Sequence, residues 1–167
     1  MQSLFKNLFS DAVYDQFESP MGLLTIIASP TNLYAVLWEN EYQNMWIKLK
    51  IEKNNKVIIE TINQLTEYFQ GKRKIFDLPL TMHGTEFQLK TWEILQKIPY
   101  ASTMTYAEQA EKLGNKNKAR AVGAANSLNP LSIIVPCHRV IGANGKLTGF
   151  RGGLSQKKFL LELEKSY

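Results

Sequence analysis

The chain has 167 residues, of which 44% are hydrophobic and 21% charged, a composition typical of a globular protein with one domain or two small ones. No apolar run approaches the roughly 20 residues that span a membrane, and the N-terminal residues lack the pattern of a signal peptide. The single cysteine cannot form an internal disulfide, which is typical of a reducing compartment. We therefore expect a cytoplasmic protein.

Charge is distributed unevenly along the chain. Residues 1–83 carry eight Lys and Arg against nine Asp and Glu, a net charge of −1, whereas residues 84–167 carry twelve against six, a net charge of +6. This asymmetry and a change of pattern at the same point predict two domains, 1–83 and 84–167. The excess positive charge indicates an anionic partner for the second domain, although a lysine-rich solvated surface would give the same balance.

The pattern of the first domain predicts a small antiparallel sheet followed by a helix. Residues 13–18 alternate loosely between polar and apolar side chains, and residues 23–28 and 33–38 are short apolar runs. Turn-forming residues separate the three segments. Four apolar residues then recur at helical spacing before Gly71, namely Ile58, Ile62, Leu65 and Phe69. Nothing in this domain points to chemistry.

The second domain is predicted to be mostly helical. One helix is expected to close before Pro99, and a last helix, capped by Ser155, is expected to run through Glu164. A sheet in the first domain and helices in the second place the chain in the mixed α/β (α+β) class.

Two short helices in the second domain resemble a helix-turn-helix. Thr105 and Glu108 fit a capping box, which begins a helix that stops at Gly114. The next helix, capped by Asn117, is expected from residue 118 to about 127. Its middle consists of small residues apart from one arginine, which favours either close packing against another helix or close approach to DNA in a narrow minor groove. The sequence does not separate these two explanations.

The only cysteine, Cys137, lies in an apolar segment at residues 133–140. The apolar residues before it predict the end of a buried strand, and Pro136 fixes the backbone where the chain must turn. A lone cysteine is often a small buried hydrophobe. Here His138 and Arg139 follow directly, and a nearby imidazole or cation favours the reactive thiolate. Neighbouring side chains on a strand point to opposite faces, so thiol and imidazole can meet only if the chain bends after Cys137.

Several motifs of the second domain together resemble those of the O6-alkylguanine-DNA alkyltransferases, also called methylated-DNA–protein-cysteine methyltransferases. The resemblance extends over about residues 84–164, and the motifs occur at the family's spacing. They are Thr105-Tyr106, the Ala-Arg-Ala-Val-Gly stretch around Arg120, Asn129, the Pro-Cys-His-Arg-Val core at 136–140 and the loop at 148–154. The first domain is similar in outline to the family's ribonuclease-H-like sheet domain. The family's second domain implies a winged-helix-like arrangement that contains the helix-turn-helix.

The resemblance implies a role for each residue around the cysteine. Cys137 would be the nucleophile, His138 would act as its base through a bound water, and Glu164 would orient the imidazole. Asn129 would brace the turn that carries the nucleophile. Tyr106 would push on a phosphate and donate its hydroxyl proton to the leaving guanine. The product is an S-alkyl thioether with no easy reverse reaction, so the protein would act once and would need no cofactor and no metal.

The resemblance also implies that double-stranded DNA with alkylated bases is the partner of a monomer that has no obligate protein partner and no membrane contact. The O6 atom of a stacked guanine cannot reach a thiol in a closed pocket, so the nucleotide must rotate out of the duplex, and Arg120 would replace the lost base. Further DNA contacts are expected from Tyr106, Ala121, Gly123, Ala124, Arg139 and Arg151. The pocket walls are expected from Val135, Pro136, Gly149, Phe150 and Gly152.

Two other functions fit part of the pattern. A winged-helix regulator without catalysis would use the same basic domain and helix pair, but it does not explain a Cys-His pair with a matching carboxylate. A cysteine hydrolase would use Cys137 and His138, but it would turn over repeatedly and leave Arg120 unexplained. The sequence leaves open how large an alkyl group is accepted and whether O4-alkylthymine is also repaired.

Overall fold

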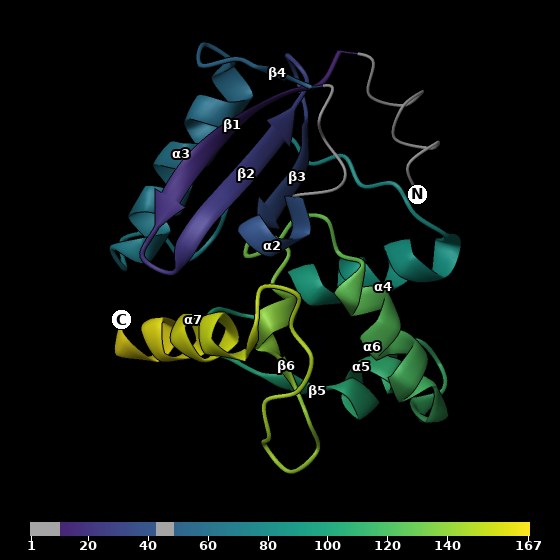
Figure 1. Ribbon diagram of the computed structural model, residues 1–167. Helices are drawn as coiled ribbons and strands as arrows, with labels where there is room; N and C mark the ends of the chain where they lie inside the picture. The colour runs from purple at the N-terminus through teal and green to yellow at the C-terminus, as the bar shows by residue number, and fades with distance from the viewer. Residues whose placement is uncertain (1–10, 43–48) are drawn as a thin grey trace. The chain divides into compact units, whose positions relative to one another are not determined.

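The computed structural model describes residues 11–42 and 49–167, and the chain divides into two compact units, Met1–Thr81 and Met82–Tyr167. The domain boundary expected from the sequence, between residues 83 and 84, lies two residues further along the chain than this division. Figure 1 labels the helices and strands of both units.

The first unit contains a four-stranded sheet in the order β3-β2-β1-β4. Strands β1 (Val13–Ser19), β2 (Gly22–Ala28) and β3 (Leu33–Trp38) pair antiparallel, and the short β4 (Lys50–Ile51) pairs parallel to β1. The hairpin between β1 and β2 turns at Gly22, whose positive φ of 117° suits glycine. The three predicted strands are therefore confirmed. A single helical turn, α2 (Glu39–Tyr42), follows β3.

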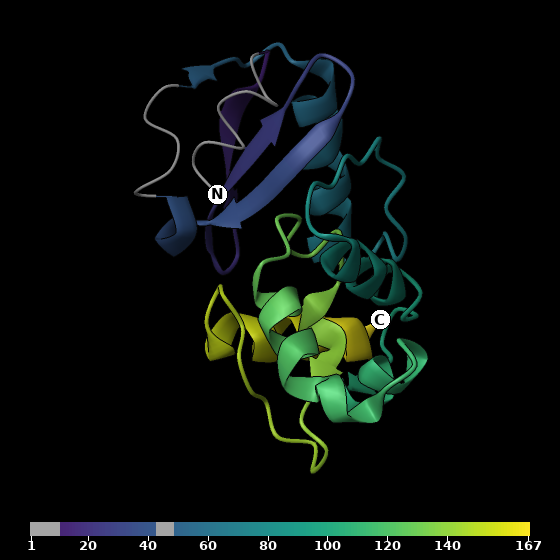
Figure 2. The same ribbon diagram turned by 90° about the vertical axis from the view of Figure 1, so that its right-hand side faces the viewer.

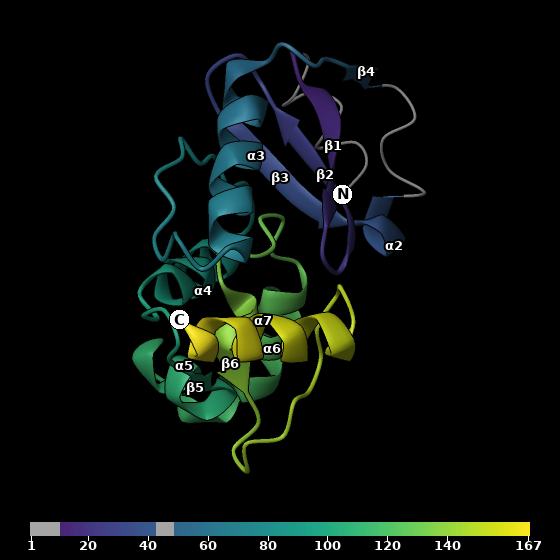
Figure 3. The same cartoon turned by 90° about the vertical axis from the view of Figure 1, so that its left-hand side faces the viewer.

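Helix α3 (Lys56–Phe69) covers one face of this sheet, as Figures 1 and 3 show, and it contacts β1 and β2. Asn55 begins the helix by accepting a hydrogen bond from the backbone N–H of Ile58, and Gly71 follows its end with a φ of 72°. The core between helix and sheet consists of fully buried side chains, among them Leu24, Ile26, Ile58, Leu65 and Tyr68. The predicted helix and its stop are confirmed.

The second unit is built from helices α4 (Glu86–Gln96), α5 (Tyr106–Lys112), α6 (Ala119–Ser127) and α7 (Leu154–Ser166). Two short strands, β5 (Met104–Thr105) and β6 (Val140–Ile141), pair in parallel. Helices α4, α5 and α6 contact one another, and a long loop joins β6 to α7 (Figures 1 and 2). No helix in the described ranges is long and apolar enough to cross a membrane.

The caps of these helices partly follow the sequence prediction. The capping box of Thr105 and Glu108 is present, and Gly114 follows α5 with a φ of 88°. Asn117, however, does not cap α6, because a 3₁₀ turn (Lys116–Lys118) capped by Asn115 precedes that helix.

The predicted cap of the last helix is wrong. Gly153 occupies the cap position of α7 with a φ of 106° and no side-chain bond, so the helix begins before Ser155. The Ser155 hydroxyl instead donates to the Gln156 side chain at 2.6 Å.

Candidate active site

A tight turn presents Cys137. The predicted strand end at residues 133–135 is wrong, because residues 132–134 form a turn in which Ile133 has a positive φ of 72°. Asn129 holds this turn, since its amide donates to the Val135 carbonyl at 2.8 Å and accepts from the Leu131 N–H at 3.0 Å. Cys137 then begins a 3₁₀ turn (Cys137–Arg139) and is partly exposed. The bend that the sequence required immediately after Cys137 is thus present.

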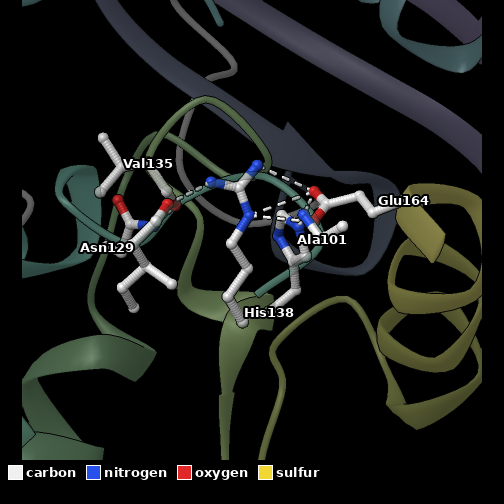
Figure 4. A network of polar contacts seen from close by, with 7 residues as sticks. Ala101, Asn129, Val135, His138 and Glu164 are labelled. Atoms are coloured by element: carbon white, nitrogen blue, oxygen red, sulfur yellow. Dashed lines mark hydrogen bonds and ion pairs between the residues drawn. The ribbon is translucent and has the colours of Figure 1, made fainter. Parts of the chain in front are cut away.

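His138 and Glu164 form a buried pair from the 3₁₀ turn and α7 (Figure 4). His138 Nε2 lies 2.8 Å from Glu164 Oε1, and both side chains are fully buried. An ionised carboxylate can only accept hydrogen bonds, so Nε2 must carry the proton and donate it. In the neutral imidazole Nδ1 then keeps its lone pair, and Nδ1 has no hydrogen-bond partner among the residues that the structure describes. The ring therefore has a basic nitrogen that faces away from its carboxylate.

The pKa values of this pair keep the imidazole neutral and the carboxylate charged. Burial by itself raises the pKa of Glu164, but the hydrogen bonds from His138 and Arg139, together with the positive charge of Arg139, outweigh it and lower that pKa to about 2. Burial lowers the pKa of His138, against the opposing effect of Glu164. At neutral pH the imidazole is therefore able to accept a proton.

Arg139 does not have the DNA-contacting position that the sequence predicted. Its side chain is 8% exposed and donates to Glu164 from Nε at 3.0 Å and from Nη2 at 2.9 Å. Its Nη1 donates to the Ile98 carbonyl at 2.6 Å. A guanidinium held in this way by a buried carboxylate cannot also reach a phosphate. Arg139 instead fixes Glu164, which also accepts from the Ala101 N–H at 3.0 Å (Figure 4).

A cavity of about 380 Å³ opens beside Cys137. Its lining residues are Tyr106, Gly123, Asn126, Ser127, Asn129, Ser132, Cys137, Thr148, Gly149, Phe150 and Arg151. Of the predicted pocket walls, Gly149 and Phe150 line it. Val135, Pro136 and Gly152 are buried and do not line it. The sequence prediction did not include Asn126, Ser127, Ser132 and Thr148, which reach the cavity from α6 and from loops.

Tyr106 lies at the wall of the cavity at the start of α5. Its hydroxyl donates to the Thr148 carbonyl at 3.1 Å, which connects α5 to the loop before α7. Burial raises the pKa of Tyr106, the hydrogen bond to Thr148 lowers it, and the negative charge of an ionised Cys137 raises it. Tyr106 is therefore protonated at neutral pH and close enough to Cys137 to sense its charge.

Lys157 is a member of the site that sequence reasoning missed. It is fully buried, and its ammonium donates to the Val140 carbonyl at 2.6 Å and the Thr148 carbonyl at 2.8 Å. Burial lowers the pKa of Lys157 to about 8, and the negative charge of an ionised Cys137 opposes that shift. The spacing of Lys157, Leu160, Leu161 and Glu164 on one buried face of α7 is the signal that would have found it.

Helix α6 carries four of the predicted DNA-contacting residues. Arg120, Ala121 and Ala124 are exposed, and Gly123 is partly buried beside Tyr106. A Cβ added at Gly123 would lie 3.6 Å from the Tyr106 ring, which is an ordinary contact. The packing of the helix therefore does not require glycine at this position.

Comparison with known proteins agrees with this geometry. A family model described as 6-O-methylguanine DNA methyltransferase, DNA binding domain, matches residues 86–166, and one described as the ribonuclease-like domain of the same protein matches residues 12–82. The chain belongs to the 6-O-methylguanine DNA methyltransferase family. The mixed α/β fold and the resemblance found in the sequence are thereby confirmed.

Individual members of the methyltransferase family match over most of the chain. The methylated-DNA–protein-cysteine methyltransferase of Mycobacterium tuberculosis is 54% identical over 92% of this chain and 92% of its own length, and that of Methanosarcina acetivorans is 46% identical over 92% and 98%. The crystal structure of M. tuberculosis O6-methylguanine methyltransferase has a TM-score of 0.87 at 42% identity and covers 93% of each chain. A structure of M. tuberculosis OGT in complex with DNA has a TM-score of 0.85 at 42% identity and covers 92% of each chain.

Proposed function

We infer that this protein is a methylated-DNA–protein-cysteine methyltransferase, which repairs O6-alkylguanine in double-stranded DNA by moving the alkyl group to Cys137. The observation that carries this function is a partly exposed cysteine at a cavity, followed in the chain by a histidine that forms a buried pair with Glu164. Family membership and the DNA complex of an M. tuberculosis relative support DNA as the partner.

In the proposed reaction the thiol proton of Cys137 passes through a water to Nδ1 of His138, and Glu164 stabilises the resulting imidazolium. The positive charge of the buried Lys157 favours the thiolate. The sulfur then bonds to the alkyl carbon, and the carbon–O6 bond breaks with its electron pair on the guanine. Tyr106 donates its hydroxyl proton to the leaving base and recovers a proton from solvent, and His138 releases the thiol proton to solvent. The thioether that remains has no easy reverse reaction, so each molecule acts once, without cofactor or metal.

The exposed face of α6 is proposed to enter the minor groove of the DNA. Rotation of the damaged nucleotide into the cavity costs a few kcal/mol, and the Arg120 side chain then takes the place of the base in the stack. The small residues Ala121, Gly123 and Ala124 allow the helix to approach the DNA closely. Because the packing of α6 would accept alanine at residue 123, the DNA explanation for its glycine is favoured over the packing explanation. Arg151, exposed at the cavity, contacts a phosphate.

Residues 84–167 form the catalytic DNA-binding domain in this proposal, and residues 1–83 form the sheet-and-helix domain. The protein acts as a monomer in the cytoplasm without an obligate protein partner. A binding-only regulator would need neither the buried relay nor a reactive cysteine. A hydrolase would not need the exposed arginine of α6.

The function is tested by incubating the protein with a duplex oligonucleotide that contains one O6-methylguanine. We expect the peptide that contains Cys137 to gain one methyl mass, with at most one methyl per protein molecule. Intact DNA binding without an adduct would identify a regulator, and repeated turnover would identify a hydrolase.

Replacing Arg120 with alanine is expected to slow repair in duplex DNA by about tenfold or more, because only the duplex needs a group that fills the stack. Reaction with free O6-alkylguanine should change little. Lys116→Ala removes the same charge from an exposed position near the start of α6 and serves as control. Single-turnover rates on both substrates measure the effect, and equal losses on the two substrates for Arg120→Ala would show that its role is different.

A Lys157→Met variant is expected to have a Cys137 thiol that reacts about tenfold more slowly with iodoacetamide at pH 7, because the cation that favours the thiolate is lost. Its rate profile should also move to higher pH, which loosened packing alone would not cause. Lys158→Met is the matched control, because Lys158 is exposed on the same helix. Identical pH profiles for Lys157→Met and the unmodified protein would remove Lys157 from the proposed mechanism.

A further inference from the structure

A pair of side-chain amides connects helices α4, α5 and α6 behind the cavity. Gln109 on α5 and Asn126 on α6 exchange hydrogen bonds, from Asn126 Nδ2 to Gln109 Oε1 at 2.8 Å and from Gln109 Nε2 to Asn126 Oδ1 at 3.2 Å. Gln109 Nε2 also donates to the Thr91 carbonyl on α4 at 3.1 Å. Gln109 is fully buried and Asn126 is 6% exposed.

The Thr91 carbonyl sets the orientation of both amides. A backbone carbonyl can only accept, so the nitrogen of Gln109 must face it, and Oε1 of Gln109 must then accept from Asn126. The nitrogen of Asn126 is therefore also fixed. Without this anchor the two ends of either amide would be interchangeable.

The pair leaves one N–H of Asn126 for another partner. An amide nitrogen carries two N–H groups, and the reciprocal pair uses one of them. Among the described residues no second acceptor meets Asn126 Nδ2, although the residue lines the same cavity as Cys137 and Tyr106. Burying an amide N–H without a partner is unfavourable, so a group that enters the cavity gains by accepting from it.

We propose that Asn126, held in one orientation by Gln109, is a specificity-determining residue that donates a hydrogen bond to a ring nitrogen of the base bound in the cavity. This inference rests on the proposed function. Alkylation at O6 removes the proton from N1, so N1, N3 and N7 of the damaged base are all acceptors. The fixed N–H would thus recognise the base itself, whereas the relay of His138 and Glu164 serves the transfer of its alkyl group.

The test compares four substrates, O6-methylguanine and its 1-deaza, 3-deaza and 7-deaza analogues, each in the same duplex. Every analogue replaces one acceptor nitrogen with a C–H group. The variant is the double substitution Gln109→Leu with Asn126→Leu, because replacing both partners leaves neither amide buried and unpaired. Each single-turnover rate is divided by the same protein's rate on O6-methylguanine, so that a general loss of activity or stability cancels.

We expect one analogue to react about tenfold more slowly with the unmodified protein, and we expect this selective penalty to disappear in the double variant. The same relative rates for all three analogues in both proteins would overturn the inference. Failure of the proposed function would be distinguishable, because the unmodified protein would then transfer no methyl group from O6-methylguanine itself.

Discussion

A Cys137→Ser variant is expected to transfer no detectable alkyl group, a loss on the order of 10⁴-fold or more. The hydroxyl of serine remains protonated near pH 7, whereas a thiol with an imidazole relay and a nearby ammonium ion ionises readily. In the proposed mechanism Cys137 provides the sulfur at the cavity, and His138 and Lys157 provide the base and the positive charge. The adduct is measured by mass spectrometry of the whole protein after reaction with duplex O6-methylguanine.

A DNA-binding measurement on the Cys137→Ser variant distinguishes the loss of the nucleophile from misfolding. Serine differs from cysteine by one atom, and the residue is partly exposed. The fold should therefore be retained, and the affinity for the damaged duplex should change by less than about twofold. A Ser variant that still gains a methyl mass at normal rate would show that another residue is the acceptor.

The second large effect is expected for Glu164→Gln, which should lower the free energy of unfolding by on the order of 3 kcal/mol at pH 7. The reason is that the hydrogen bond from His138 loses its charged acceptor and the buried charge of Arg139 loses the carboxylate that holds it. The Glu164 pKa falls from 4.5 to about 2 on folding. A lowered carboxylate pKa contributes stability that is fully present above pH 4.5 and is lost as the pH falls toward 2.

Urea unfolding of both proteins between pH 7 and pH 3 measures this pH dependence. The difference in stability should be largest above about pH 5 and shrink below pH 4.5. Glu162→Gln is the matched control, since Glu162 is exposed on the same helix. A difference that stays constant down to pH 3 would mean that the charge of Glu164 does not stabilise the fold.

The same substitution is expected to slow alkyl transfer by about a hundredfold or more. A carboxylate forces the proton of His138 onto Nε2, whereas a glutamine amide accepts or donates equally well and so permits the other tautomer. In that tautomer Nδ1 carries a proton and cannot act as the base. Single-turnover rates at a pH and urea concentration where both proteins are folded separate this effect from stability.

Local sequence patterns were sufficient to predict much of the secondary structure. The strands at residues 13–19, 22–28 and 33–38, the helix that stops at Gly71 and the capping box of Thr105 depend on hydrogen bonds and burial within a few residues. The candidate nucleophile was also identified from its neighbours. Glu164 was assigned by family resemblance, because nothing in its own surroundings in the sequence distinguishes it from a surface carboxylate.

What the sequence by itself determined is therefore the kind of most of the elements, the two-part organisation and the candidate nucleophile. The tertiary structure alone decided which polar side chains are buried. It turned Arg139 from a predicted DNA contact into the partner of Glu164, and it brought Lys157 and Asn126 into the site. The physical reason is that the direction and ionisation of a side chain depend on groups distant in the sequence. Arg139 and Glu164 are 25 residues apart, and no local pattern encodes their contact.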